Sequence, residues 1–189
     1  MRTRFAAVGG TAALAAAAVL VAAPAAEAKT ASLKSSYSCQ TDFGAQEVGV
    51  TTTMVLPAKV KKNKLVAAKP VKLLVVIPES LATLMRTVGI TSLSGSASGV
   101  KASVGTTKVA VKGVKFPATN VPASGPMKIK AAGTASAFKI KKPGTYVVSI
   151  PKSFKFTAKD QNGNPLLNNA PCTVVKGAPT KLGKLKVVK

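Results

Sequence analysis

The chain has 189 residues, of which 28 are Lys or Arg and 5 are Asp or Glu, so its formal charge is +23. It contains no His, which removes His-based nucleophile relays, His zinc sites and His acid–base catalysis. Apolar residues make up 47% of the chain and aromatic residues only 4%, so its core must be built mainly from Val, Ala, Leu and Ile. The composition favours a folded, strongly basic protein that is not an enzyme.

Residues 1–28 have the three parts of a secretory signal peptide. Arg2 and Arg4 precede a long apolar run, and Ala26-Glu27-Ala28 places small residues on both sides of a cleavage point. An uncleaved membrane anchor is the alternative, but much of the run is Ala and Gly, which insert weakly into a bilayer. We expect cleavage after Ala28, no transmembrane helix in the remaining chain, and a secreted protein, either free or associated with the cell wall.

Export determines how the two cysteines are interpreted. In an oxidising compartment Cys39 and Cys172 can persist as a disulfide, and two separate buried thiols are the alternative. A bond between them would close a loop that contains almost the whole domain. In the loop-entropy model such a loop is worth on the order of 4 to 5 kcal/mol.

Short β-prone runs separated by Gly, Pro and Asn follow Cys39. Val and Thr dominate residues 49–56, and residues 70–77 form an almost continuous apolar run, as in a strand buried on both faces. Four more segments alternate apolar and polar residues, which predicts half-buried antiparallel strands. They are residues 108–114, 127–130, 138–141 and 153–157.

One segment has helical spacing instead. Between residues 78 and 88 the apolar side chains of Leu81, Leu84, Met85 and Val88 recur at intervals of three and four, which predicts a short amphipathic helix. Gly89 can take the left-handed conformation that ends such a helix.

A dense turn signal lies near the C-terminus. The run Asp160-Gln161-Asn162-Gly163-Asn164-Pro165 predicts the turn of a β-hairpin. A calcium loop is the alternative, although a single carboxylate is a poor ligand set for Ca²⁺.

These elements predict a mainly β protein. We expect an Ig-like antiparallel β-sandwich with one short helix, and a partly open β-barrel is the alternative. The expected organisation is a signal peptide over residues 1–28, a single β-sandwich domain over 29–175, and a basic C-terminal tail or edge strand over 176–189.

The order of these features resembles a known family. Tyr37-Ser38-Cys39 followed by Gly44, the helix from Pro78-Glu79-Ser80 to Gly89, and a lone second cysteine, Cys172, are similar to an actinobacterial family of secreted domains of unknown function with an Ig-like sandwich. The resemblance implies a Cys39–Cys172 disulfide and an extracellular location. It carries over no catalytic residue, and the high Lys content of this chain departs from it.

The remaining chemistry is sparse. The acidic residues left after cleavage, Asp42, Glu47, Glu79 and Asp160, are scattered and do not suggest a catalytic carboxylate pair. A Ser–Lys dyad needs no His, but no motif of such enzymes accompanies the abundant Ser and Lys. We therefore assign no catalytic residue, no metal ligand and no cofactor.

Lys is the one compositional excess, and it concentrates on the predicted solvent faces of strands. Such rows create a positive field that attracts polyanions, and outside a cell these include anionic wall polymers. The alternative is that the charge serves solubility and protects strand edges. Sequence-specific nucleic-acid binding is not expected, because Arg86 is the only Arg left after cleavage and few aromatics remain. The candidate polyanion ligands are Lys108, Lys112, Lys128, Lys130, Lys139 and Lys141.

The sequence thus predicts a non-enzymatic secreted binding or structural module whose partner is an anionic cell-wall polymer or another polyanion. A structural or protein-interaction domain is the alternative, and an enzyme of unrecognised type comes third.

Overall fold

A computed structural model describes residues 28–42 and 44–189; the expected signal peptide, apart from Ala28, lies outside the described residues. The described residues are mainly β, with one short helix. Eight strands form the main sheet around the interior: β1 (Ala28–Thr41), β2 (Gly44–Pro57), β5 (Lys69–Ile77), β6 (Ser92–Ser98), β8 (Thr107–Asn120), β9 (Met127–Ala135), β12 (Ser153–Lys159) and β13 (Pro165–Val174). The other elements are β3 (Lys59–Lys61), β4 (Leu65–Val66), α1 (Glu79–Thr87), β7 (Lys101–Val104), β10 (Phe138–Lys139), β11 (Gly144–Ser149) and β14 (Lys181–Val188).

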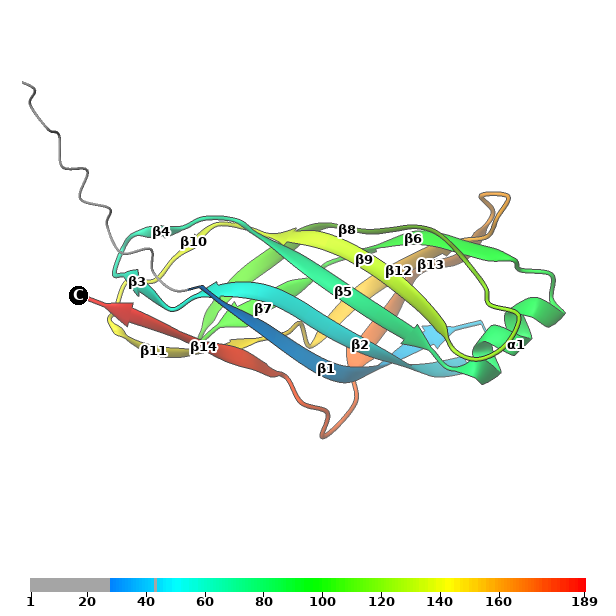
Figure 1. Cartoon of the computed structure of the whole chain (residues 1–189), viewed down its shortest axis with the longest axis horizontal. Coiled ribbons are helices and arrows are strands. Elements are labelled where there is room, and N and C mark those ends of the chain that lie inside the picture. Colours follow the sequence, from blue (N-terminus) through cyan, green and yellow to red (C-terminus); the bar gives the residue numbers. More distant parts are fainter. Residues whose placement is uncertain (1–27, 43) are drawn as a thin grey trace, which may run out of the picture.

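The eight main strands close into an antiparallel barrel (Figure 1). Their order is β8, β6, β12, β13, β1, β2, β5 and β9, and β9 pairs again with β8. The expected Ig-like sandwich is therefore wrong, and the barrel alternative describes the fold, although the barrel is closed and not partly open. Both architectures bury every second residue of each strand, so the alternation in the sequence does not distinguish them.

Strand β8 belongs to two sheets. Its first half pairs with β7, and a second sheet continues from β7 to β11, β14 and β3. A register shift between Lys112 and Lys115, where Gly113 has a φ of 63°, lies within the pairing of β8 with β9, just beyond the residues that pair with β7. The C-terminal segment, expected as a tail or an edge strand, forms β14, which lies between β11 and β3 and places Gly183 against Leu56 and Ala31.

The predicted helix is present as α1 and lies at one end of the barrel (Figure 1). Gly89 follows it with a φ of 76°, as expected for the residue that ends a helix. The buried side of α1 differs from the predicted stripe, because Ala82 and Met85 are buried whereas Val88 is 53% exposed. The helix covers the barrel end with its middle turn, and Val88, the residue directly after it, is left at the rim.

Strand β5 departs from the expectation for residues 70–77. Its inward residues, such as Val71 and Ile77, are buried, but Lys72 on the opposite face is exposed and Leu74 and Val76 are half-buried. A barrel wall has one solvent side, whereas only a strand covered on both faces would bury the whole run. No helix in the described part of the chain is long and apolar enough to span a lipid bilayer.

Candidate functional site: the barrel interior and the lysine face

The barrel encloses an apolar cavity of about 630 Å³. Its walls are inward-facing residues of the barrel strands, among them Val50, Val75 and Ile129, and its end near α1 includes Leu81 and Met85. A second cavity, at the end where the second sheet covers the barrel, has only about 60 Å³. The interior is thus well filled at that end and hollow toward α1.

Small side chains leave this space free. Ala97, Ala131 and Ala158 point into the cavity from three different strands, where a Leu or Phe would fill part of it. Gly95 lies on the same inner wall, opposite Phe116, whose ring occupies the position of the missing side chain. An eight-stranded barrel is just wide enough either to be filled by side chains or to hold one small ligand, and here the small residues leave room for a ligand.

Four of the six aromatic residues that the structure describes line the cavity. The rings of Tyr37 and Phe154 are 5.0 Å apart, and those of Phe116 and Phe156 are stacked at 5.6 Å. The Tyr37 hydroxyl donates a 2.6 Å hydrogen bond to the carbonyl oxygen of Pro151, and burial raises the pKa of Tyr37 well above its usual value. The deep part of the cavity therefore presents ring faces and a phenol that already has a partner.

Polar residues gather at the α1 end of the cavity. They come from the β1–β2 turn, with Thr41 and Asp42, and from the β12–β13 turn, with Gln161 and Asn162. The Gln161 amide ties the second turn to the end of α1, because its Oε1 accepts from the Thr91 N–H and its Nε2 donates to the Gly89 carbonyl, both at 3.1 Å. This end is the mouth of the cavity.

The β12–β13 turn confirms the predicted hairpin, and Asp160 organises it. Its carboxylate accepts hydrogen bonds from the backbone N–H groups of Asn162 and Asn164 and from the Asn164 side chain, at 2.8–3.0 Å. Desolvation is the largest single influence and raises the pKa of Asp160, but the hydrogen bonds from Asn164, Asn162 and Gly163 together outweigh it and hold that pKa below its usual value. The carboxylate proposed as the start of a calcium loop is thus occupied by the turn itself.

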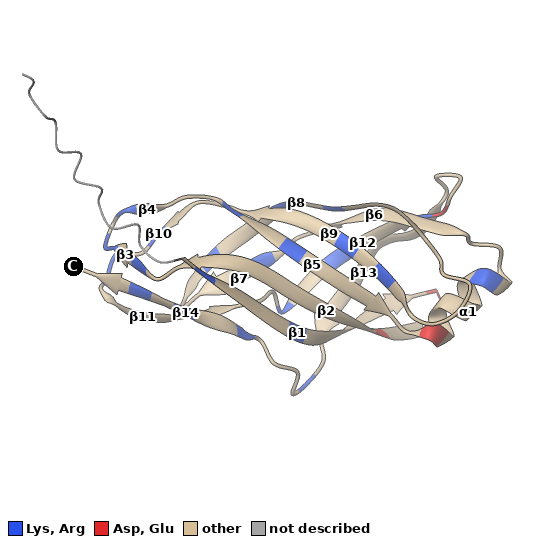
Figure 2. Cartoon of the chain, viewed as in Figure 1, with Lys and Arg blue, Asp and Glu red and all other residues tan. Residues whose placement is uncertain are grey.

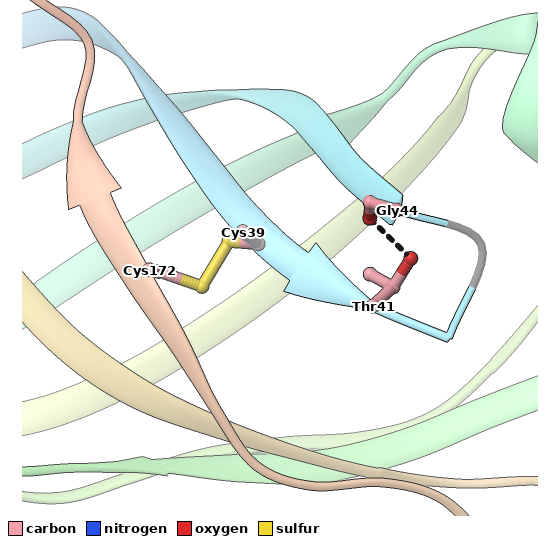
Figure 3. The surroundings of a disulfide bond; sticks show 4 residues. All are labelled: Cys39, Thr41, Gly44 and Cys172. Atoms are coloured by element: carbon pink, nitrogen blue, oxygen red, sulfur yellow. Dashed lines mark hydrogen bonds between the residues drawn. A yellow bond between two sulfur atoms is a disulfide. The ribbon is translucent and has the colours of Figure 1, made fainter.

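A disulfide joins Cys39 and Cys172, as expected (Figure 3). It connects two neighbouring strands of one wall, β1 and β13, rather than two facing sheets as in an Ig core. Both cysteines are buried and line the cavity. In Figure 3 the Thr41 hydroxyl donates to the Gly44 carbonyl at 2.8 Å, which closes the β1–β2 turn two residues beyond Cys39.

Exposed Lys side chains lie on the outer faces of the neighbouring strands β5, β8 and β9. Lys72 and Lys115 are both register partners of the exposed Ala132, one on each side, and Lys130 lies two residues along β9 on the same face. We call the set Lys72, Lys112, Lys115, Lys128 and Lys130 the lysine face.

The structure distributes the six predicted polyanion ligands unevenly. All six are exposed. Lys112, Lys128 and Lys130 belong to the lysine face, and Lys108 lies four residues before Lys112, on the half of β8 that pairs with β7. Lys139 and Lys141 are on and just after the short strand β10, which pairs with β4 at the end of the molecule opposite α1 (Figure 1). Lys72 and Lys115 complete the group but were not selected from the sequence.

The acidic residues that the structure describes are scattered in the sequence but lie toward one end of the fold. Asp42, Glu47, Glu79 and Asp160 all lie toward α1, whereas Lys is spread along the walls and the opposite end (Figure 2). Glu79 accepts a 2.9 Å hydrogen bond from the Gly125 N–H. Within the described ranges, no three His, Cys, Asp or Glu side chains are grouped so that they could hold a metal ion.

The comparisons with known proteins identify a family. A family model described as a family of unknown function (DUF6801) matches residues 36–183, which confirms the resemblance at that level. A search of curated proteins found no match, and a search of solved structures found none either.

Proposed function

We propose that this chain, which belongs to a family of unknown function (DUF6801), is an exported, non-enzymatic binding protein that encloses an apolar small molecule in its barrel. The observation that carries the proposal is the cavity of about 630 Å³. Export is supported by the signal-peptide pattern of residues 1–28 and by the disulfide.

The size and lining of the cavity favour a ligand over a packing defect. Protein interiors are close-packed, and voids much larger than a water molecule are few. An apolar cavity of about 150 Å³ already binds small apolar molecules, and ligand sites generally measure about 300–1,000 Å³. This cavity falls in that range, and its polar residues lie mainly at one end, as in sites where apolar walls bind and a few polar groups orient the ligand.

A neutral dye tests this function. N-phenyl-1-naphthylamine, whose fluorescence rises in apolar surroundings, should bind the wild-type protein with one saturable site. Ala131→Trp places an indole inside the cavity, while Ala132→Trp places the same group on the solvent side of the same strand. We expect Ala131→Trp to weaken dye binding at least about tenfold and Ala132→Trp to leave it unchanged. Absence of saturable binding, or equal effects of the two variants, would overturn the proposal.

A second function, adhesion to anionic polymer, is favoured by the lysine face. Three cations of that face, Lys72, Lys115 and Lys130, surround one small exposed residue, Ala132, so a polyanion strand could approach closely. The alternative explanation is solubility. Lys130 and Lys128 are register partners of the half-buried Leu74 and Val76, and their aliphatic stems can shield this outer apolar surface. Both explanations are compatible with a ligand inside the barrel.

A further inference from the structure

The charged residues that line the cavity have the opposite sign to the net charge of the chain. The sequence holds 28 basic and 5 acidic residues, yet no Lys or Arg among the described residues lines the cavity. Asp42 and Asp160 both do. A site for an anionic head group would be expected to include a Lys or Arg in its lining, and this cavity has none among the described residues.

The two carboxylates at the mouth differ in what they can still bind. Both oxygens of Asp160 already accept hydrogen bonds within the β12–β13 turn. Asp42 is exposed and has no hydrogen-bond partner in the described part of the chain. It lies at the end of β1, next to Thr41, so its carboxylate is the negative group available to a ligand at the mouth.

The apolar part of the cavity is long enough for an alkyl or isoprenoid tail. Inward residues of β5 line it from Leu73 to Ile77, which corresponds to about 13 Å at about 3.3 Å per residue. The aromatic pair Tyr37 and Phe154 lies in the lining on the side of β1 and β12, away from the mouth residues. An apolar tail directed inward would place its head group at the mouth.

From this arrangement we infer that the ligand is an amphiphile with one apolar tail and a head that donates hydrogen bonds and carries no negative charge, such as an alcohol or an amine. This inference rests on the proposed function. A carboxylate or phosphate head at the mouth would lie beside the Asp42 carboxylate with no cation of the lining to compensate it, and two like charges close together repel each other. A hydroxyl or ammonium head can donate to Asp42 instead.

Displacement of N-phenyl-1-naphthylamine by dodecanol, dodecylamine and dodecanoate, at pH 8 and physiological ionic strength, tests the inference. The comparison of amine with carboxylate is the decisive one, because the positive surface of the protein repels the amine and attracts the carboxylate. We expect dodecylamine and dodecanol to displace the dye at concentrations at least about tenfold lower than dodecanoate. If dodecanoate competes as well as dodecylamine does, the inference is wrong.

A pair of charge reversals locates the effect. Asp42→Lys and Glu47→Lys change the net charge equally, but only Asp42 lines the cavity. Asp42→Lys should strengthen the binding of dodecanoate and weaken the binding of dodecylamine by about fivefold each. This factor corresponds to an interaction of about 1 kcal/mol between charges near a solvated surface. Glu47→Lys should change neither. Equal shifts in both variants would reduce the effect to net charge and overturn the inference. Failure of the dye itself to bind wild type would instead refute the proposed function, and this inference with it.

Discussion

Cys39 and Cys172 are direct register partners on β1 and β13, in a ladder of only three residue pairs. The pairing of β1 with β2, by contrast, runs over 14 residue pairs. The covalent bond therefore reinforces the shortest of the ladders that β1 makes and joins the first strand of the barrel to the last.

Removing this bond should destabilise the protein strongly. The closed loop spans a sequence separation of 133 residues, for which the loop-entropy model gives a loss on the order of 5 kcal/mol in unfolding free energy. Urea unfolding of the wild type with and without reductant measures the loss. A Cys39→Ala/Cys172→Ala variant is the control and should not respond to reductant, whereas a wild-type protein equally stable in both conditions would contradict the prediction.

Gly95→Ala should destabilise the barrel by about 1–3 kcal/mol, because an added methyl overpacks a filled position. Its Cβ would lie 2.7 Å from the Phe116 ring and against the Thr157 carbonyl. Gly49→Ala is a matched control on another barrel strand, since the nearest atom to its Cβ would be Val76 Cβ at 3.8 Å. Thermal unfolding of both variants checks the prediction, and the control should be neutral or slightly stabilising. Equal melting temperatures of the Gly95→Ala and Gly49→Ala variants would contradict the prediction and show that neighbouring atoms shift to accommodate the methyl group at Gly95.

The stability of the protein should decrease above about pH 10 through Tyr37. Burial raises the pKa of Tyr37 in the folded state, whereas the unfolded phenol has its ordinary pKa of about 10. Below that pH the Tyr37 hydroxyl is protonated in both states, so its titration does not lower the unfolding free energy. Above it only the unfolded state releases the proton, so the unfolding free energy falls by about 1.4 kcal/mol per pH unit until the folded pKa is reached.

Comparison with Tyr37→Phe isolates this contribution from the titration of Lys. At pH 7 the variant should lose about 1 kcal/mol, because the hydrogen bond to the Pro151 carbonyl is absent. The difference between wild type and variant should shrink and then reverse as the pH rises from 9 to 12. Parallel curves over this range would exclude Tyr37 as the cause.

Polyanion binding, if it belongs to the lysine face, should depend on position and not only on charge. Lys72→Gln/Lys115→Gln/Lys130→Gln should weaken retention on immobilised heparin, used as a model polyanion, and reduce its salt dependence. Lys181→Gln/Lys184→Gln/Lys186→Gln removes the same charge from β14 and should have a smaller effect. Unfolding free energies of both variants should stay within about 1 kcal/mol of wild type, since exposed charges contribute little. Equal losses of retention would assign the effect to net charge and favour solubility as the role of the lysines.

Several individual strands and the helix were predictable from the sequence, but the closure of the strands into a barrel was not. The spacing of Leu81 and Met85 identified the helix, and the alternation of Val109 and Val111 with Lys identified β8. Strand β1 was missed, because Ser and Lys are frequent in it and its first half has only Ala31 and Leu33 as apolar residues on the inner face. Whether strands close into a barrel depends on the β8–β9 pairing across the bulge at Gly113, which leaves no local pattern.

The cavity could not be predicted from the sequence either, for a related reason. Ala97, Ala131 and Ala158 are ordinary core residues in a sandwich, where the facing sheet fills the space they leave. In the barrel no second sheet packs against the inner face, so these small residues line a cavity. The one available signal was the low aromatic content together with many Ala and Gly, which limits how completely a barrel of this size can be filled.

The short β1–β13 ladder also determines when the wall can be completed during synthesis. Strands β1 and β2 are adjacent in the chain and can pair early, but the partner of Tyr37 on the other side is Val174. A chain that emerges N-terminus first therefore exposes one edge of β1 until nearly all of it is available, and long-range pairing of this kind is slow. Closure of the barrel is thus tied to the emergence of nearly the whole chain, because β13 follows the other barrel strands in sequence.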